Sequence, residues 1–586
     1  DLLSQVRRFV VWRAALLLVG VVTGACGSSE PAGTTPGNGD AAFSKLAQAV
    51  LDDHYARNPS EATYLGIHRF DDQLDDFSAA AATREAEALR KFRAELAAID
   101  PATLTADNAL DREQLILALD ARVLELDTIR MREKDPDAYS SGITNAAYVI
   151  MERNYAPAAT RLRSLVAREL RMPAALEEGR KNLTQAVPIY TEIAIEQIDG
   201  NQSFFRNDVP AAFLEVTDAA LLREFKEANA AVIAALGKYK TFLEKEALPK
   251  AKGSFAFGEE TFRKYLAARE MVDLPIERLL EIAEADRQKN EAAFQAIARQ
   301  IDAKKSADEV LASLQKDHPP AAQLLKATQQ TLDSIHQFIV DHHIMTIPPS
   351  DPAEVIETPP FMRSTTSASM DTPGPFETAK LRGLYNMTLP DLRMSAAEQA
   401  DFMRQWYYAS ISNTSVHEVY PGHFVQFLYA PEFPSDVRKV FSANTNVEGW
   451  AHYCEQMMLD EGFHAGEPAY RVAQLQDALL RDVRFIVGIR MHTRGMSVEE
   501  ATKLFETEGH QPHPLAVSEA KRGTSDALYG YYTLGKLMIL KLRDDYKAKM
   551  GAAYTLQGFH DTFMKLGPLP LPLIRRAMLG SAGSPL

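Results

Sequence analysis

Apolar residues recur at intervals of three and four along most of the chain, which is the period of a helix with one buried face. The pattern begins near Ala41, where Phe43, Leu46, Val50 and Leu51 follow this spacing. It returns in stretches rich in Ala, Glu, Lys and Leu, at residues 79–98, 109–127, 158–185, 217–247 and 276–302. The pattern predicts a mainly helical, all-α fold, and Pro173 is expected to start or kink a helix within its stretch.

One segment interrupts the helical period. Residues 344–393 are rich in Pro, Thr and Ser and contain two short β-prone pieces, Val355-Ile356 and residues 384–387. Because proline cannot donate a hydrogen bond to a sheet, these pieces are expected to be edge strands at best. The helical period resumes at Ser395. The segment therefore predicts a small β element inside a helical protein.

The N-terminal residues are typical of an export signal. Three arginines precede a short apolar run, residues 14–22, which is followed by Thr23, Gly24, Ala25 and Cys26. A basic segment, an apolar segment and small residues in this order form a signal peptide, and the run is too short to span a bilayer. The cysteine directly after the small residues indicates a bacterial lipoprotein with lipidation at Cys26. Thr23 stands where Leu is usual, so cleavage of an ordinary signal peptide is the alternative.

These features divide the chain into three parts. Residues 1–26 are predicted to be the signal peptide, residues 27–41 a flexible tether, and residues 42–586 a helical domain with two lobes. The mature protein is expected to be exported. It would be held at the cell envelope by its lipid, at the outer membrane if the source is Gram-negative, or be free in the periplasm.

Charge excludes one class of partner. The chain has 79 acidic and 64 basic residues, so its formal net charge is −15. Nucleic-acid binding requires a basic surface, and we therefore expect no nucleic-acid partner. The two cysteines cannot form a disulfide framework. We expect a monomer that contacts the membrane only through the lipid.

The segment that carries chemistry reads SVHEVYPGHFVQFL, at residues 415–428. A His-Glu pair followed closely by a second His is the signature of zinc peptidases. Two neutral imidazoles bind the metal, and the carboxylate beside them activates water. These roles fall on His417, His423 and Glu418.

The spacing of the two histidines requires a break in the helix. His417 and His423 are six residues apart, and a regular helix would turn the second by about 240° relative to the first. Pro421 and Gly422 occupy the interval. Proline removes a helical hydrogen bond and glycine permits unusual dihedrals, so both favour such a break. Two unrelated histidines in a kinked helix are the alternative.

A second motif, which is acidic, follows the first. Glu448, His452 and Glu455 are spaced at i, i+4 and i+7, on one face of a helix. Glu448 is the best candidate for the third ligand, which would complete the three protein ligands of a catalytic zinc site with one zinc ion per chain. His452 or Glu455 could instead orient the imidazoles, and a solvated or salt-bridged surface is the alternative for Glu455.

The sequence HEVYPGH followed by EGWAHYCE resembles the bacterial domain-of-unknown-function family 885, whose members are often lipoproteins. The segments PSEATYLGIHRFDDQLDDFS, FAFGEETFRKYL and YTLGKLMILKLR resemble that family in the same order, so the likeness covers about residues 42–586. The family is similar to the helical glutamate-zincins, such as angiotensin-converting enzyme, thimet oligopeptidase and carboxypeptidase Taq. That similarity implies two helical lobes that flank a deep channel with zinc at its floor.

The resemblance also implies roles for single residues. It assigns the metal ligands to His417, His423 and Glu448, and the general base to Glu418. In those peptidases a downstream Tyr or His stabilises the oxyanion, and two positions match. Tyr532 lies in the family's Tyr-x-x-Gly, and His492 matches a family His, although Gly488 stands where Asp is common.

The sequence therefore predicts a hydrolase, a zinc metallopeptidase that acts on peptides. The β-prone insert is expected to offer residues 383–386 as an edge strand to the substrate, with Tyr385 and Asn386 in contact. Two alternatives remain, a zinc hydrolase of a non-peptide amide or ester and a non-catalytic binding lipoprotein. The second predicts loss of the activating carboxylate, but Glu418 is present. Endo- or exopeptidase action and side-chain preference stay open.

Overall fold

The computed structural model describes residues 38–359, 367–581, 583–584 and 586. The fold is mainly α-helical, as the hydrophobic period predicts. The helices of the N-terminal part are α2 (Asp40–Arg57), α3 (Pro59–Tyr64), α4 (Ala79–Ala98), α5 (Ala106–Leu124), α6 (Met131–Lys134), α7 (Asp137–Met151), α8 (Ala158–Glu169), α9 (Met172–Asn182), α10 (Pro188–Ser203), α11 (Val209–Ala211), α12 (Ala219–Phe242) and α13 (Glu259–Glu270).

The C-terminal part contains the helices that carry the candidate chemistry. Its helices are α14 (Ile276–Ile301), α15 (Ala307–Leu314), α16 (Leu324–Asp341), α17 (Ala396–Met403), α18 (Tyr408–Glu418), α19 (His423–Leu428), α20 (Val437–Val440), α21 (Asn444–Asp460), α22 (Pro468–Thr493), α23 (Val498–Thr507), α24 (His513–Gly523), α25 (Tyr531–Met550), α26 (Leu556–Lys565) and α27 (Leu571–Leu579).

Local signals set several helix boundaries. The predicted stretch 79–98 coincides with α4, whose N-cap Ser78 accepts a hydrogen bond from the backbone N–H of Ala81. The stretch 158–185 is divided into α8 and α9, and Pro173 lies in the first turn of α9, as expected for a proline that starts a helix.

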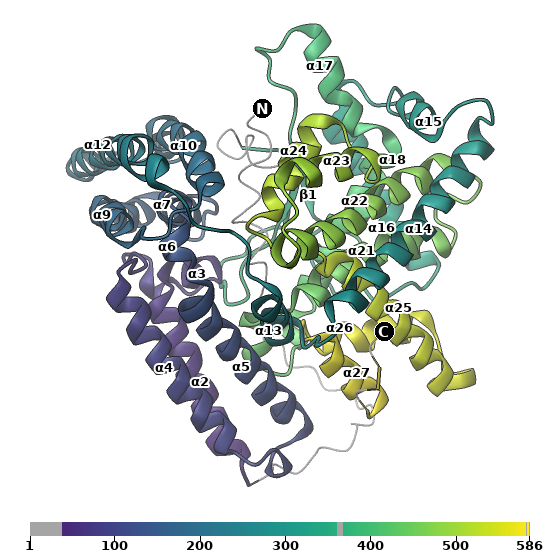
Figure 1. Ribbon diagram of the computed structural model, residues 1–586, viewed down its shortest axis with the longest axis horizontal. Helices are drawn as coiled ribbons and strands as arrows, with labels where there is room; N and C mark the ends of the chain where they lie inside the picture. Colours follow the sequence, from purple (N-terminus) through teal and green to yellow (C-terminus); the bar gives the residue numbers. More distant parts are fainter. Residues whose placement is uncertain (1–37, 360–366, 582, 585) are drawn as a thin grey trace.

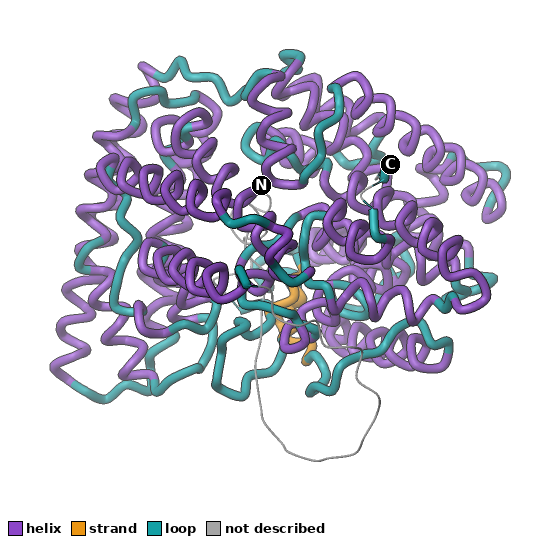
Figure 2. The backbone as a smooth tube through the Cα atoms, turned by 90° about the horizontal axis from the view of Figure 1, so that it is seen from below, coloured by secondary structure: helices purple, strands orange, loops and turns teal. Residues whose placement is uncertain are grey.

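The helices form two groups, which Figures 1 and 2 show from two directions. Helices α2 to α12 make up one group, which is purple to blue in Figure 1, and α14 to α25 lie in the other. Each group has apolar cores, although Leu110 of α5 belongs to the largest core of the second group and Val437 of α20 to a core of the first. One core is built from residues 139–247, a second mainly from residues 43–126, and the largest spans the C-terminal part. The deep channel between two lobes stays a prediction.

The β element is a three-stranded mixed sheet, drawn in orange in Figure 2. Strand β3 (Leu384–Met387) lies between β1 (Glu354–Glu357), which runs parallel to it, and β2 (Ala368–Asp371), which runs antiparallel. The prediction of a free edge at residues 383–386 is wrong. Partners on both sides use the backbone of β3, and Tyr385 and Asn386 are buried. The sheet's outer edges belong to β1 and β2.

The N-terminal helices hold the segment between β2 and β3. His68 bridges two carboxylates, with Nδ1 3.1 Å from Oδ2 of Asp71 and Nε2 3.0 Å from Oε2 of Glu377. The backbone N–H of Phe376 donates to the carbonyl of Leu65 over 3.0 Å. The small sheet therefore contacts the N-terminal group although it belongs to the C-terminal half of the sequence.

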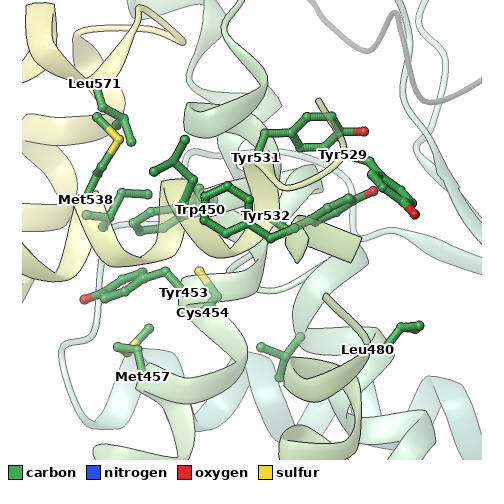
Figure 3. Close-up of a cluster of buried hydrophobic side chains, with 14 of the residues drawn as sticks. Trp450, Tyr453, Cys454, Met457, Leu480, Tyr529, Tyr531, Tyr532, Met538 and Leu571 are labelled. Atoms are coloured by element: carbon green, nitrogen blue, oxygen red, sulfur yellow. The ribbon is translucent and has the colours of Figure 1, made fainter. Parts of the chain in front are cut away.

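Helices α21 and α25 approach until their backbones touch. A Cβ atom at Gly449 would lie 2.6 Å from Cα of Gly535, so only a residue without a side chain fits at this crossing. Figure 3 shows the core around it, with Trp450 of α21 and Tyr532 and Met538 of α25 among its side chains. The crossing brings the acidic motif of α21 next to the first turn of α25.

Candidate metal centre

The helix that carries the first histidine ends before the second begins. Helix α18 stops at Glu418, and α19 starts at His423. The peptide bond between Tyr420 and Pro421 is cis. A Cβ atom at Gly422 would overlap the carbonyl oxygen of His417, so glycine lets the chain fold back closely on α18. The break that the spacing predicts at Pro421-Gly422 is therefore present.

Three side chains converge at this break. The Nε2 atoms of His417 and of His423 each lie 3.4 Å from Oε2 of Glu448. One ligand atom from each residue lies within 4.8 Å of the others, and the two imidazole planes are nearly perpendicular, at 89°. In a tetrahedral zinc site with bonds of about 2.0–2.1 Å, neighbouring ligand atoms are separated by roughly 3.4 Å.

The donor set suits a divalent metal of intermediate softness. Two imidazole nitrogens and one carboxylate oxygen are the ligands that zinc accepts in catalytic sites. Oε2 of Glu448 is buried and makes no hydrogen bond of good geometry to any described residue. A buried carboxylate oxygen normally has a partner, so this atom fits the role of a metal ligand.

The two histidines and the glutamate affect each other's ionisation. Burial alone would raise the pKa of Glu448, but the imidazoles of His423 and His417 hold it well below its ordinary value. Burial lowers the pKa of His417, but its contacts with Glu448 and Glu455 outweigh burial and raise it to about 9. Without a metal, Glu448 is therefore anionic and His417 is protonated near neutral pH, and metal binding would release the imidazole proton.

A second carboxylate lies behind His417. Oε1 of Glu455 is 2.7 Å from Nδ1 of His417, and Nη2 of Arg481 is 3.0 Å from the same oxygen. His452 contacts the other oxygen of Glu455 through Nδ1, over 3.4 Å. Glu455 thus orients an imidazole, whereas His452 lies one contact further out. Arg481, on α22, was missed by sequence reasoning because no motif marks it.

Glu418 follows the ligand His417 directly in α18 and is not part of the cluster of ligand atoms. Its Oε2 accepts a hydrogen bond from the backbone N–H of Met370 in β2, over 3.3 Å. Burial and the nearby carboxylate of Glu418 together raise the pKa of Tyr385 well above its ordinary value. The small sheet therefore flanks Glu418, and the backbone of Met370 contacts the Glu418 carboxylate. Sequence motifs of side chains cannot reveal a backbone contact of this kind.

Of the two candidates for oxyanion stabilisation, only Tyr532 lies near the ligands. Its ring centroid is 6.4 Å from that of His417, and burial together with Glu448 raises the pKa of Tyr532. His492 is buried elsewhere, where Nε2 is 2.8 Å from the carbonyl oxygen of Gly523. It lies eleven residues beyond Arg481 on the same helix, or about 16 Å along its axis. The expectation that His492 could serve is therefore corrected.

Two further residues complete the comparison with the sequence. Cys26, the expected lipidation site, lies outside the described residues. Cys454 is a free, buried thiol in the core of Figure 3, and burial raises its pKa well above the ordinary value. A buried thiol of high pKa is inert, so Cys454 is a packing residue.

The helical fold and the cluster of His417, His423 and Glu448 identify the chain as a candidate metalloprotein. The sequence matches the family described as bacterial protein of unknown function, DUF885, over residues 59–578. The chain belongs to this DUF885 family.

Solved structures of two bacterial proteins share the fold. One is a candidate lipoprotein of unknown function from Shewanella oneidensis, with 26% identity and a TM-score of 0.78, and the match covers 92% of this chain and 99% of that one. The other is a candidate lipoprotein from Colwellia psychrerythraea, with 16% identity and a TM-score of 0.78, over 92% and 98% of the two chains. No curated protein matches the sequence. Among the described helices, none is both long and apolar enough to cross a membrane.

Proposed function

We propose that this protein is a zinc-dependent metallopeptidase with one zinc ion held by His417, His423 and Glu448. The observation that carries the proposal is the convergence of these three ligand atoms within 4.8 Å, with Glu418 directly after His417 in the chain and outside the ligand cluster. Three protein ligands leave one position open, which is the arrangement of catalytic rather than structural zinc sites.

Each neighbouring group has a chemical role in this proposal. Zinc, when bound, polarises the scissile carbonyl and lowers the pKa of water. Glu418 takes the proton of the attacking water as general base and passes it to the leaving amine. Tyr532 donates a hydrogen bond to the oxygen on which negative charge develops. Glu455 keeps the lone pair of His417 Nε2 directed at the metal.

We propose that an extended peptide substrate lies along the outer edge of β2. The backbone N–H of Met370 points toward Glu418, so it points away from β3 and leaves this edge on the side of the site. Backbone hydrogen bonds to a sheet edge recognise a peptide of almost any sequence. We therefore move the proposed substrate strand from residues 383–386 to β2, with peptides as the substrate class.

The test combines metal analysis with digestion. Purified protein is loaded with zinc, its metal content is measured, and it is incubated with a peptide library and with small amide and ester substrates. We expect about one zinc per chain and cleavage of peptides by the parent protein only, with Glu418→Gln as the inactive, zinc-containing control.

Other results would favour other functions. Cleavage of the small acyl substrates without peptide cleavage would indicate a hydrolase of non-peptide amides or esters. Zinc binding without hydrolysis of either class would indicate a binding lipoprotein. Zinc absent from the parent protein would contradict the metal site itself.

We also propose that the protein is exported and anchored at the cell envelope by a lipid on Cys26. Two observations support this location. The sequence around Cys26 is typical of a lipoprotein signal, and the similar solved protein from Shewanella oneidensis is a candidate lipoprotein. Such an anchor would place the metal centre outside the cytoplasm, where peptides from the envelope or the medium are available.

A further inference from the structure

We propose that Arg522 is a positioning residue that aims the hydroxyl of Tyr532 at the substrate oxygen. The inference rests on the proposed function and deepens it, because it concerns how the hydrogen-bond donor to the oxyanion is oriented. Arg522 lies near the end of α24, and Tyr532 is in the first turn of α25. Neither the motif around the histidines nor the acidic motif of α21 contains Arg522.

The guanidinium of Arg522 is held in one orientation. Its Nε and Nη2 atoms donate to Oδ2 of Asp526 over 3.2 and 2.9 Å. The same Nη2 lies 3.2 Å from the hydroxyl oxygen of Tyr531 and 3.5 Å from that of Tyr532. The side chain is buried, so these contacts are made away from bulk water, where they are stronger.

The two neighbouring tyrosines differ in whether the hydroxyl proton has an acceptor. Tyr531 donates its proton to Oδ2 of Asp526 over 3.1 Å, so that proton is already used. One Nη2 hydrogen of Arg522 is shared between the hydroxyl oxygens of Tyr531 and Tyr532, and among the described residues Tyr532 has no acceptor for its own proton. Because arginine can only donate, this contact occupies a lone pair and leaves the Tyr532 O–H available.

Charge adds to this geometry. Three guanidinium groups lie over the Tyr532 ring, those of Arg481, Arg484 and Arg522, at 5.5, 5.2 and 5.9 Å from its centroid. Positive charge near a phenol oxygen withdraws electron density from it and makes its O–H a stronger donor. A stronger donor stabilises the oxyanion of the transition state more than it stabilises the neutral carbonyl of the ground state. This difference is what catalysis requires.

Arg484 provides a matched comparison within the same protein. It is also buried, also lies over the Tyr532 ring, and also makes two hydrogen bonds to one carboxylate, both of 2.8 Å to Glu519. No hydrogen bond joins it to the Tyr532 hydroxyl among the described residues. Arg484 therefore shares the charge, the burial and the ring contact of Arg522, but lacks the contact that the inference requires.

The experiment is a double-mutant cycle on the zinc-loaded full chain with one cleaved peptide. Tyr532→Phe is expected to lower kcat by roughly 10²–10³-fold, the usual effect of removing one oxyanion donor. Arg522→Gln is expected to lower kcat by about tenfold or more with little change in KM, since the contact acts on the transition state. Combined with Tyr532→Phe, it should add less than about twofold, because both changes remove the same interaction.

Two further variants separate the effect of the hydroxyl contact from effects of charge and folding. Arg522→Lys keeps the charge beside Asp526 but loses the planar fork, so it should fold with the parent's zinc content and still lose kcat. Arg484→Gln should lower kcat much less than Arg522→Gln. Calorimetric binding of a phosphinic peptide, whose tetrahedral anion imitates the oxyanion, should weaken in Arg522→Gln by the same factor as kcat/KM falls.

Several results would overturn the inference. Independent, multiplying losses in the double variant would show that Arg522 does not act through Tyr532. Equal losses in Arg484→Gln and Arg522→Gln would assign the effect to charge or packing rather than to the hydroxyl contact. A zinc-loaded parent that cleaves no peptide would overturn the proposed function, and the role of Arg522 with it. An active parent with an additive cycle would overturn the role of Arg522 alone.

Discussion

Nδ1 of His417 lies 2.7 Å from Oε1 of Glu455, a carboxylate with a fully buried side chain. In the neutral imidazole that would bind a metal, this contact assigns the Nδ1 proton to the carboxylate and leaves the lone pair on Nε2, the atom that faces Glu448. Glu455 is seven residues from Glu448, so one face of α21 carries both a candidate ligand and the group that orients another ligand.

The first prediction concerns this orienting contact. Glu455→Gln should lower zinc affinity by roughly 10–100-fold, the usual effect of removing a partner that orients a histidine ligand. The affinity is measured by competition with a chelator of known strength. Glu467→Gln, which changes an exposed carboxylate near the start of α22, is the control and should bind zinc like the parent. Equal affinities in all three proteins would remove Glu455 from the site.

The second prediction separates the base from the ligand. Glu418→Gln keeps size and hydrogen bonding but removes the basic carboxylate, so it should keep zinc and lose roughly 10²–10⁴-fold in rate. Glu448→Gln should lose zinc affinity because a neutral amide is a poor ligand. Metal content and peptide cleavage are measured on both variants. Loss of zinc from Glu418→Gln, with full activity in Glu448→Gln, would mean that the two roles are reversed.

The third prediction tests the crossing of α21 and α25. Gly449→Ala places a methyl group against Gly535 and should destabilise the C-terminal core by about 1–3 kcal/mol, the usual effect of overpacking. Gly200→Ala is the control, because Gly200 lies within α10 and a Cβ there meets nothing within 4 Å. The control should be as stable as the parent or slightly more stable. Urea unfolding followed by circular dichroism provides the comparison.

The fourth prediction concerns pH and the contact between the N-terminal helices and the sheet. Burial lowers the pKa of His68, but hydrogen bonds to Asp71 and Glu377 outweigh it and raise the pKa to about 9. Because the folded pKa exceeds the unfolded one, near 6.5, this stabilisation is complete below about pH 6.5 and is lost as pH rises through 9. Because the imidazole is partly exposed, solvent screening reduces this contribution, and we expect about 1–2 kcal/mol.

The measurement is the urea midpoint of the parent protein and of His68→Gln between pH 6 and pH 10. The difference between the two proteins should shrink as pH rises, since the variant lacks the titrating group. Other groups that titrate in this window, such as Glu152 with a pKa raised to about 8 by burial and the nearby Asp371, are present in both proteins. A difference that is constant with pH would show that folding does not raise the pKa of His68.

The fifth prediction concerns Cys26. A fatty acid supplied to cells that express the full chain should label the parent protein and leave Cys26→Ala unlabelled. Fractionation should place the labelled protein in the envelope. Export without labelling would support cleavage of an ordinary signal peptide, the alternative that Thr23 leaves open.

The sequence by itself determined the helical fold class, the candidate ligands and the break between them. These features depend on neighbours in the chain. A period of three to four residues reports a buried helix face, and Pro421-Gly422 disrupts a helix whatever surrounds it. The spacing of Glu448 and Glu455 places both on one face for the same reason.

Only the tertiary structure decided which distant residues join the site. Tyr532 and His492 both match positions of the family pattern. The crossing at Gly449 and Gly535 brings Tyr532 to the ligands, whereas His492 lies beyond Arg481 toward the end of α22. The strand at residues 384–387 looked like an edge, but β1 and β2 pair with both of its sides. Such contacts join residues far apart in sequence. Whether they form depends on how helices and strands pack, which the local pattern of apolar and polar residues does not specify.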